Sequence, residues 1–253
     1  MVKPRSKAKS KSVQLELRLP TRGGAREGAG CKRKRERATV KHVRRAPFRA
    51  WKPVLVTMRM CRGVPNLRER SAWAVIVRTM RAVRAHAPLR VVHYSVMSNH
   101  IHAIIEADGH AAFVAGMRAL TIRLARALNV HFARTGRLLD HRYDARSLGS
   151  PREVRNALQY VLLNARKHAA ERGESLPRSW IDPRSTAVRF DGWAEPPSVR
   201  CAKDFGVEEP QTWLLRVGWR EHGLLPLDAV PGPLALQRVI GNAMHRGPLP
   251  RGD

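Results

Sequence analysis

Two histidines, His100 and His102, stand two residues apart at the start of a run rich in β-branched residues. In a β-strand, residues i and i+2 point to the same face, so both imidazoles would project together. Neutral imidazole nitrogens are the commonest metal ligands in proteins, and the pair is therefore half of a divalent-metal site. The alternative is that both are simply polar residues of a strand, and the spacing alone leaves the two interpretations open.

Tyr160 and Asn164 form a second pair, one turn apart on a later helix. Tyr160 lies well off the apolar stripe of that helix and Asn164 on its flank, and with Asn156 and Lys167 they make a polar strip. If the helix packs on the sheet, Tyr160 and Asn164 lie along its edge, where they can reach a site on the sheet. A phenol attacks a phosphodiester only when a metal polarises the phosphate and helps to ionise the phenol. The alternative is an ordinary tyrosine on a helix surface.

These four residues suggest one metal centre. His100 and His102 would supply two nitrogen ligands and Asn164 a carbonyl oxygen, with water and phosphate oxygens completing the shell. A mixed nitrogen and oxygen set with open positions suits Mg²⁺ or Mn²⁺, and Mn²⁺ tolerates imidazole better. The expected product is a 5′-phosphotyrosine bond and a free 3′-hydroxyl.

The elements that must position these residues follow from hydrophobic periodicity. A capping box, Ser150-Pro151-Arg152-Glu153, marks the start of the tyrosine helix. The order of elements predicts an α+β fold with a ferredoxin-like βαββαβ core, in which helices pack on one face of an antiparallel sheet. The added helix would carry the tyrosine. The predicted ranges are strand 54–60, helix 66–86, a strand pair within 90–106 joined by the Ser98-Asn99 break, helix 111–134, strand 137–148 and a helix from 150 to about 170.

Composition divides the chain into three parts: a basic arm over 1–47, the folded domain over 48–171 and a C-terminal extension over 172–253. The net charge of +28 indicates a polyanionic partner, for which we expect nucleic acid, with an acidic membrane surface as the alternative. Residues 1–50 carry 17 Lys and Arg against three Glu. We interpret this region as a disordered arm that neutralises phosphates, or as a plain flexible leader.

Three cysteines without a Cys-x-x-Cys spacing indicate neither a disulfide framework nor a structural zinc site. No apolar run approaches the length of a membrane span. We therefore expect a cytoplasmic, nucleoid-associated protein without a membrane partner. Short helices are also expected over 211–221 and 233–245, and Trp180 and Trp193 are expected to pack back on the core.

His100-Ile101-His102 after Ser98-Asn99, followed by Tyr160-Val-Leu-Leu-Asn164 on a later helix, resembles the IS200-like (Y1) tyrosine transposases of the HUH endonuclease superfamily. The REP-associated type is the most similar, and the resemblance covers about residues 50–170. Ser98 and Ala165 stand where prolines are usual, and neither change removes a reacting atom. The resemblance implies that Tyr160 is the nucleophile and that His100, His102 and Asn164 hold Mg²⁺ or Mn²⁺. Asn99 would orient the first histidine.

The resemblance also implies a substrate, single-stranded or hairpin DNA that is cut and rejoined in DNA transposition or in the processing of REP-like hairpins. Several basic residues could contact its phosphates, and a solvated face is the alternative for each: Arg142, Arg146, Arg123, Arg126, Lys167, Lys32, Arg33, Lys34 and Arg35. Two rival functions stay open. One is a non-catalytic DNA- or RNA-binding protein on the same fold, and the other is a metal enzyme that uses water and leaves Tyr160 dispensable. The sequence leaves open whether the protein is a monomer or a homodimer.

Overall fold

The core of the protein is a four-stranded antiparallel sheet. The structure is a computed structural model that describes residues 47–197, 199, 201 and 203–232. The strands are β1 (Val54–Arg59), β2 (Arg90–Val96), β3 (His100–Glu106) and β4 (Asp144–Ser147). They are arranged in the order β2-β3-β1-β4, and each neighbouring pair is antiparallel. This order is that of a ferredoxin-like split βαβ unit, and the predicted α+β class is confirmed.

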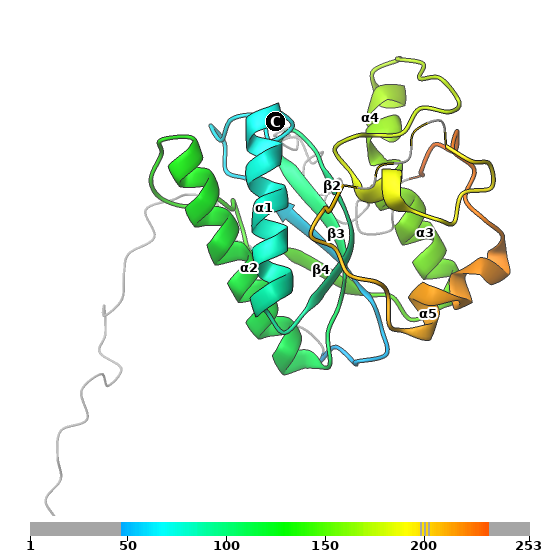
Figure 1. Cartoon of the computed structure of the whole chain (residues 1–253), viewed down its shortest axis with the longest axis horizontal. Coiled ribbons are helices and arrows are strands. Elements are labelled where there is room, and N and C mark those ends of the chain that lie inside the picture. Colours follow the sequence, from blue (N-terminus) through cyan, green and yellow to red (C-terminus); the bar gives the residue numbers. More distant parts are fainter. Residues whose placement is uncertain (1–46, 198, 200, 202, 233–253) are drawn as a thin grey trace, which may run out of the picture. The chain divides into compact units, whose positions relative to one another are not determined.

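Helices cover both faces of this sheet (Figure 1). On one face, α1 (Arg70–His86) and α2 (His110–His131) pack side by side. On the other face lies α3 (Pro151–Leu162), which contacts β2 and β3 and is followed by α4 (Asn164–Glu171). The predicted added helix is therefore the element that places Tyr160 against the sheet.

The alternation of side chains along β3 explains this layering. Ile101, Ala103 and Ile105 are fully buried, and their period of two directs them to the face opposite the histidines. His102 instead reaches Tyr160 of α3. Both faces of β3 are thus covered, one by an apolar core and the other by a layer that contains the predicted chemical groups.

Three predicted boundaries differ most from the structure. The helix predicted from 66 begins at Arg70, because the Asn66 side chain accepts a hydrogen bond from the Arg68 amide and closes a turn there. The strand predicted over 137–148 contains only β4, because the Arg137 side chain bonds the carbonyls of Leu139 and Asp140 in a turn. The helix predicted from 150 to about 170 breaks at Leu163, which separates α3 from α4.

The C-terminal extension packs against the core through buried ionic groups. Glu106, at the end of β3, is fully buried and accepts hydrogen bonds from the backbone amides of Gln211 and Thr212 and from the Thr212 hydroxyl. Trp193 is buried, and Trp180 is half-buried. Within its described residues, the extension also forms three short helices, η1 (Thr186–Arg189), α5 (Trp213–Arg216) and η2 (Gly218–His222). The helix predicted over 233–245 and the basic arm lie outside the described residues, apart from residue 47 of the arm.

Candidate functional site

Strands β1 and β3 place four polar side chains on the sheet face that α3 covers. His100 and His102 lie with their rings 4.6 Å apart. In the antiparallel register, Arg59 pairs with His100 and Thr57 with His102. The Thr57 hydroxyl lies 2.9 Å from Nδ1 of His102, which leaves Nε2 as the nitrogen that faces the site. The alternation of side chains along β1 indicates that Thr57 and Arg59 share one face of the sheet, but neither was predicted as a site residue.

Asn99 orients the first histidine. Its Oδ1 lies 2.8 Å from Nδ1 of His100. A carbonyl oxygen only accepts, so the proton of a neutral His100 is assigned to Nδ1 and the lone pair to Nε2. Burial first, and then the neighbouring charge of His168, lower the pKa of His100 to about 4. Burial and the His100 charge also lower the pKa of His102. Both rings are therefore neutral at physiological pH, the state in which imidazole binds a metal.

Helix α3 brings Tyr160 onto His102. Ser150 caps the helix by accepting a hydrogen bond from the Glu153 amide, and Pro151 is its first residue. The Tyr160 hydroxyl lies 3.3 Å from Nε2 of His102, with the two rings 4.8 Å apart. Tyr160 is only 4% exposed, since the flank of α3 that carries it faces the sheet rather than solvent. Burial raises its pKa to about 12, and the Glu171 charge acts in the same direction.

Asn164 is the first residue of α4, immediately after the break at Leu163. Its side chain is fully buried, and neither amide atom has a hydrogen-bond partner among the described residues. A buried amide without partners is costly and needs an explanation. A cation bound by the carbonyl oxygen would satisfy that oxygen, whereas the amide nitrogen would still need an acceptor.

Three residues of α4 adjoin the site. His168 packs edge-on against His100 with the rings 5.9 Å apart, and its Nδ1 lies 2.7 Å from a Glu171 oxygen. Lys167 also pairs with Glu171, at 3.2 Å, and its ammonium lies 5.6 Å from the centre of the Tyr160 ring. Lys167 was predicted as a phosphate contact. His168 and Glu171 were not predicted, because no spacing rule connects them to the His100-x-His102 motif. Lys167 is buried rather than exposed.

The donor set fits a divalent cation only if Asn164 takes part. No group of three or more His, Cys, Asp or Glu side chains in the described part of the chain is arranged to hold a metal ion. The two neutral imidazoles and the unpartnered Asn164 oxygen do fit the mixed nitrogen and oxygen preference of Mn²⁺, or of Mg²⁺ with water ligands.

The predicted DNA contacts are spread over different parts of the fold. Arg123 and Arg126 lie on α2, on the sheet face opposite the site (Figure 1). Arg146, on β4, forms a 2.7 Å ion pair with Glu153, and Arg142 is exposed in the preceding loop. The remaining four, Lys32, Arg33, Lys34 and Arg35, lie outside the described residues.

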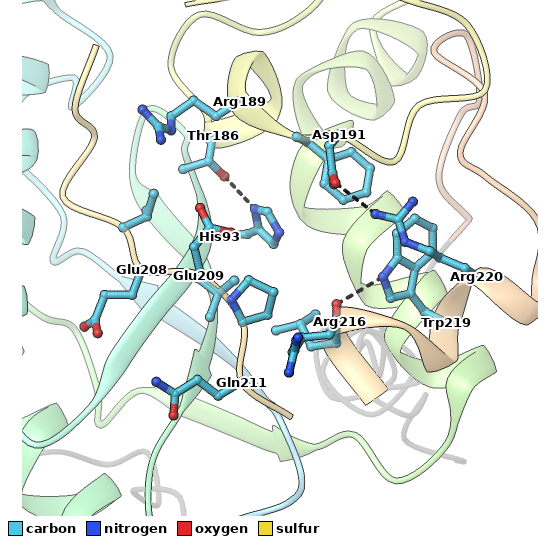
Figure 2. A pocket seen from close by; sticks show the side chains of 15 residues that line it. His93, Thr186, Arg189, Asp191, Glu208, Glu209, Gln211, Arg216, Trp219 and Arg220 are labelled. Atoms are coloured by element: carbon cyan, nitrogen blue, oxygen red, sulfur yellow. Dashed lines mark hydrogen bonds and ion pairs between the residues drawn. The ribbon is translucent and has the colours of Figure 1, made fainter. Parts of the chain in front are cut away.

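A cavity of about 950 Å³ lies elsewhere, between β2 and the extension (Figure 2). His93 lies in its wall and contacts Thr186 at 3.3 Å, while Arg220 pairs with Asp191 at 3.0 Å. The Glu208 and Glu209 carboxylates also line it, so its charges are mixed. None of the predicted catalytic residues lines this cavity.

Comparison with known proteins gives a likeness of fold. No protein-family model matches the sequence, and no curated protein matches it. One similar solved structure is a REP-associated tyrosine transposase bound to a REP hairpin, at 16% identity and a TM-score of 0.48, covering 59% of this chain and 84% of that one. Another is a candidate transposase from Deinococcus radiodurans, at 14% identity and a TM-score of 0.33, covering 53% of this chain and all of that one. In the described part of the chain, no helix has the length and apolar character needed to span a membrane.

Proposed function

We propose that this protein is a metal-dependent endonuclease and strand transferase that acts on single-stranded or hairpin DNA through Tyr160. The observation that carries the proposal is the 3.3 Å contact between the Tyr160 hydroxyl and Nε2 of His102. It joins the two sequence motifs, which are far apart in the chain, in one buried site. The net charge of +28 supports a polyanionic substrate.

In the proposed reaction, Oη of Tyr160 attacks a backbone phosphorus. The new Oη–P bond forms as the P–O3′ bond breaks, so Tyr160 keeps the 5′-phosphate and the other strand end leaves as a 3′-hydroxyl. Because no water is consumed, a 3′-hydroxyl can reverse the step and rejoin the strand. Mg²⁺ or Mn²⁺ held by His100, His102 and Asn164 would polarise the phosphate and favour the ionised phenol.

The chain's own residues account for the remaining requirements. The phenol must lose its proton although burial raises its pKa to about 12, so a nearby positive charge is required. Arg59 acts in this direction, since its charge lowers the pKa of Tyr160. Thr57 and Asn99 fix the orientation of the two imidazoles.

The test is incubation of the protein with 5′-labelled and 3′-labelled DNA hairpins, with Mn²⁺ or Mg²⁺ and with a chelator. A covalent adduct with the 3′-labelled strand, seen on a denaturing gel, is expected for the wild type. It should be absent for Tyr160→Phe and with chelator, and should persist for the control Tyr143→Phe. Cleavage that survives in Tyr160→Phe would indicate hydrolysis by water. Tight binding without cleavage across a broad hairpin pool would indicate a binding protein.

A further inference from the structure

A small cavity opens directly beside the candidate site. Its volume is about 450 Å³, at the lower end of the range for small-molecule sites and sufficient for one nucleoside. Its walls come from the β2–β3 turn, from α4 and from the extension. Asn99 and His100 form the wall nearest the site, and Trp180 lies in the wall from the extension. A strand whose phosphate reached His100 would therefore have a neighbouring base within reach of this cavity.

The two arginines in this cavity are already neutralised. Arg68 makes a bidentate pair with Asp182, at 2.8 and 2.9 Å, and also donates to the Val96 carbonyl. Arg172 makes a bidentate pair with Glu174, at 2.6 and 2.7 Å. Paired guanidiniums are poor partners for a phosphate, but their planar faces still stack on aromatic rings. Together with the Trp180 indole, they favour an uncharged, flat ligand.

The loop that carries Trp180 is held in place from both sides. Arg166 is buried and donates to four carbonyls of this loop, those of Leu176, Pro177, Arg178 and Trp180. On the other side, Asp182 is 1% exposed and is fixed by Arg68. Trp180 has no aromatic or cation–π partner within the described residues, and it is one of the residues that line the cavity. A half-buried indole on a fixed loop is a preorganised stacking surface.

We propose that this cavity binds one base of single-stranded DNA next to the phosphate that is cut, with Trp180 as the stacking surface. This inference rests on the proposed function for the position of the phosphate. It adds a binding residue from the extension, which lies outside the region that carries the catalytic motifs.

The test compares two probes, a short oligo-thymidylate strand and an abasic strand of the same length and charge. Affinities are measured by fluorescence anisotropy with a chelator present, so that no cleavage occurs, and at several salt concentrations. Trp180→Ala should weaken binding of the thymidylate strand about tenfold, since one base–aromatic stack is lost. Binding of the abasic strand and the salt dependence should not change, because both depend on phosphates.

Two further variants separate a lost stack from a damaged fold. Trp180→Phe keeps an aromatic ring and should restore most of the affinity. Trp213→Ala removes a tryptophan that is 56% exposed on α5 and does not line the cavity, and it should behave like the wild type. Equal affinity of Trp180→Ala and wild type for the thymidylate strand would overturn the proposal, as would an equal loss with the abasic strand. The covalent-adduct assay is read separately, so a missing adduct contradicts the nuclease proposal and leaves the base-dependent result intact.

Discussion

Nε2 of His102 has two roles in this account that exclude each other. Its Nδ1 is occupied by Thr57, so Nε2 is the nitrogen available to a metal, and the Tyr160 hydroxyl already lies 3.3 Å from it. Because the phenol is protonated at neutral pH, its proton is assigned to this hydrogen bond, with Nε2 as the acceptor. One lone pair cannot serve both partners. A cation held at Nε2 of His102 would therefore take the lone pair that now accepts the Tyr160 hydrogen bond.

At the scale of single residues, the contact between Asn99 and His100 gives a prediction about metal affinity. Asn99→Ala removes the acceptor that fixes the His100 ring, and loss of such a supporting hydrogen bond costs about 10- to 100-fold in metal affinity. Titration with Mn²⁺, followed by electron paramagnetic resonance of the free ion, measures the change. Asn129→Ala is the matched control, since Asn129 bonds the Gly136 carbonyl near the end of α2. Equal affinities for the two variants would contradict the role of Asn99.

At the scale of elements, the cap of α3 determines how firmly Tyr160 is held. Ser150→Ala removes the side-chain hydrogen bond to the Glu153 amide and should lower the free energy of unfolding by about 1 kcal/mol. Urea denaturation measures the difference. Ser71→Ala, at an exposed position of α1, should leave the stability nearly unchanged. A Ser150→Ala protein as stable as the wild type would show that tertiary packing, rather than the cap, holds this end of the helix.

The elements also show what periodicity can and cannot predict. Strands β2 and β3 lie within the predicted strand pair over 90–106, because two β-branched runs separated by Ser98-Asn99 favour two strands joined by a short turn. The break at Leu163 could not be predicted, since Leu162, Leu163 and Asn164 contain neither Gly nor Pro. Periodicity placed Tyr160 well off the apolar stripe, whereas the structure buries it, because burial depends on what α3 packs against.

The site was predictable to a similar extent. Sequence motifs pointed to Tyr160 and His102, and the structure brings them into contact, whereas their chemical roles remain predictions. The position of Thr57 could have been predicted, because the alternation of side chains along β1 places it on the same face of the sheet as Arg59. The position of the loop that carries Trp180 could not be predicted. Arg166 fixes this loop through backbone carbonyls, which every residue has whatever its side chain.

At the scale of the whole molecule, buried histidines make stability depend on pH. Burial lowers the pKa of His93 from 6.5 to about 4. Between these two values the unfolded chain binds a proton at His93 that the folded protein does not, so the free energy of unfolding falls as the pH falls. The loss from His93 reaches about 3 kcal/mol once the pH is below the folded pKa. Denaturation across this pH range should show that the free energy of unfolding falls less in His93→Gln than in the wild type. In His131→Gln, at an exposed position, it should fall as much as in the wild type. An unchanged loss in His93→Gln would exclude His93 as the cause.

The overall charge leads to a prediction about salt. If Lys32, Arg33, Lys34 and Arg35 contact phosphates, replacing all four by Gln should make the slope of log affinity against log salt shallower by up to about 3 for single-stranded DNA. We expect a smaller change for Arg123→Gln with Arg126→Gln, because α2 covers the face opposite the site. Anisotropy titrations at several salt concentrations measure both slopes. If the slope does not change in the fourfold variant, these four residues of the arm do not contact DNA phosphates.

The central claim is that Tyr160 becomes covalently linked to the 5′-phosphate of a cut strand. Peptide mapping by mass spectrometry, after reaction with hairpin DNA and nuclease trimming, tests it most directly. We expect a nucleotide phosphate on the peptide that contains Tyr160, present with Mn²⁺ or Mg²⁺ and absent with chelator. A phosphate on one of the other tyrosines of the chain, Tyr94 or Tyr143, would contradict this claim. Cleaved DNA with no modified peptide would contradict it too.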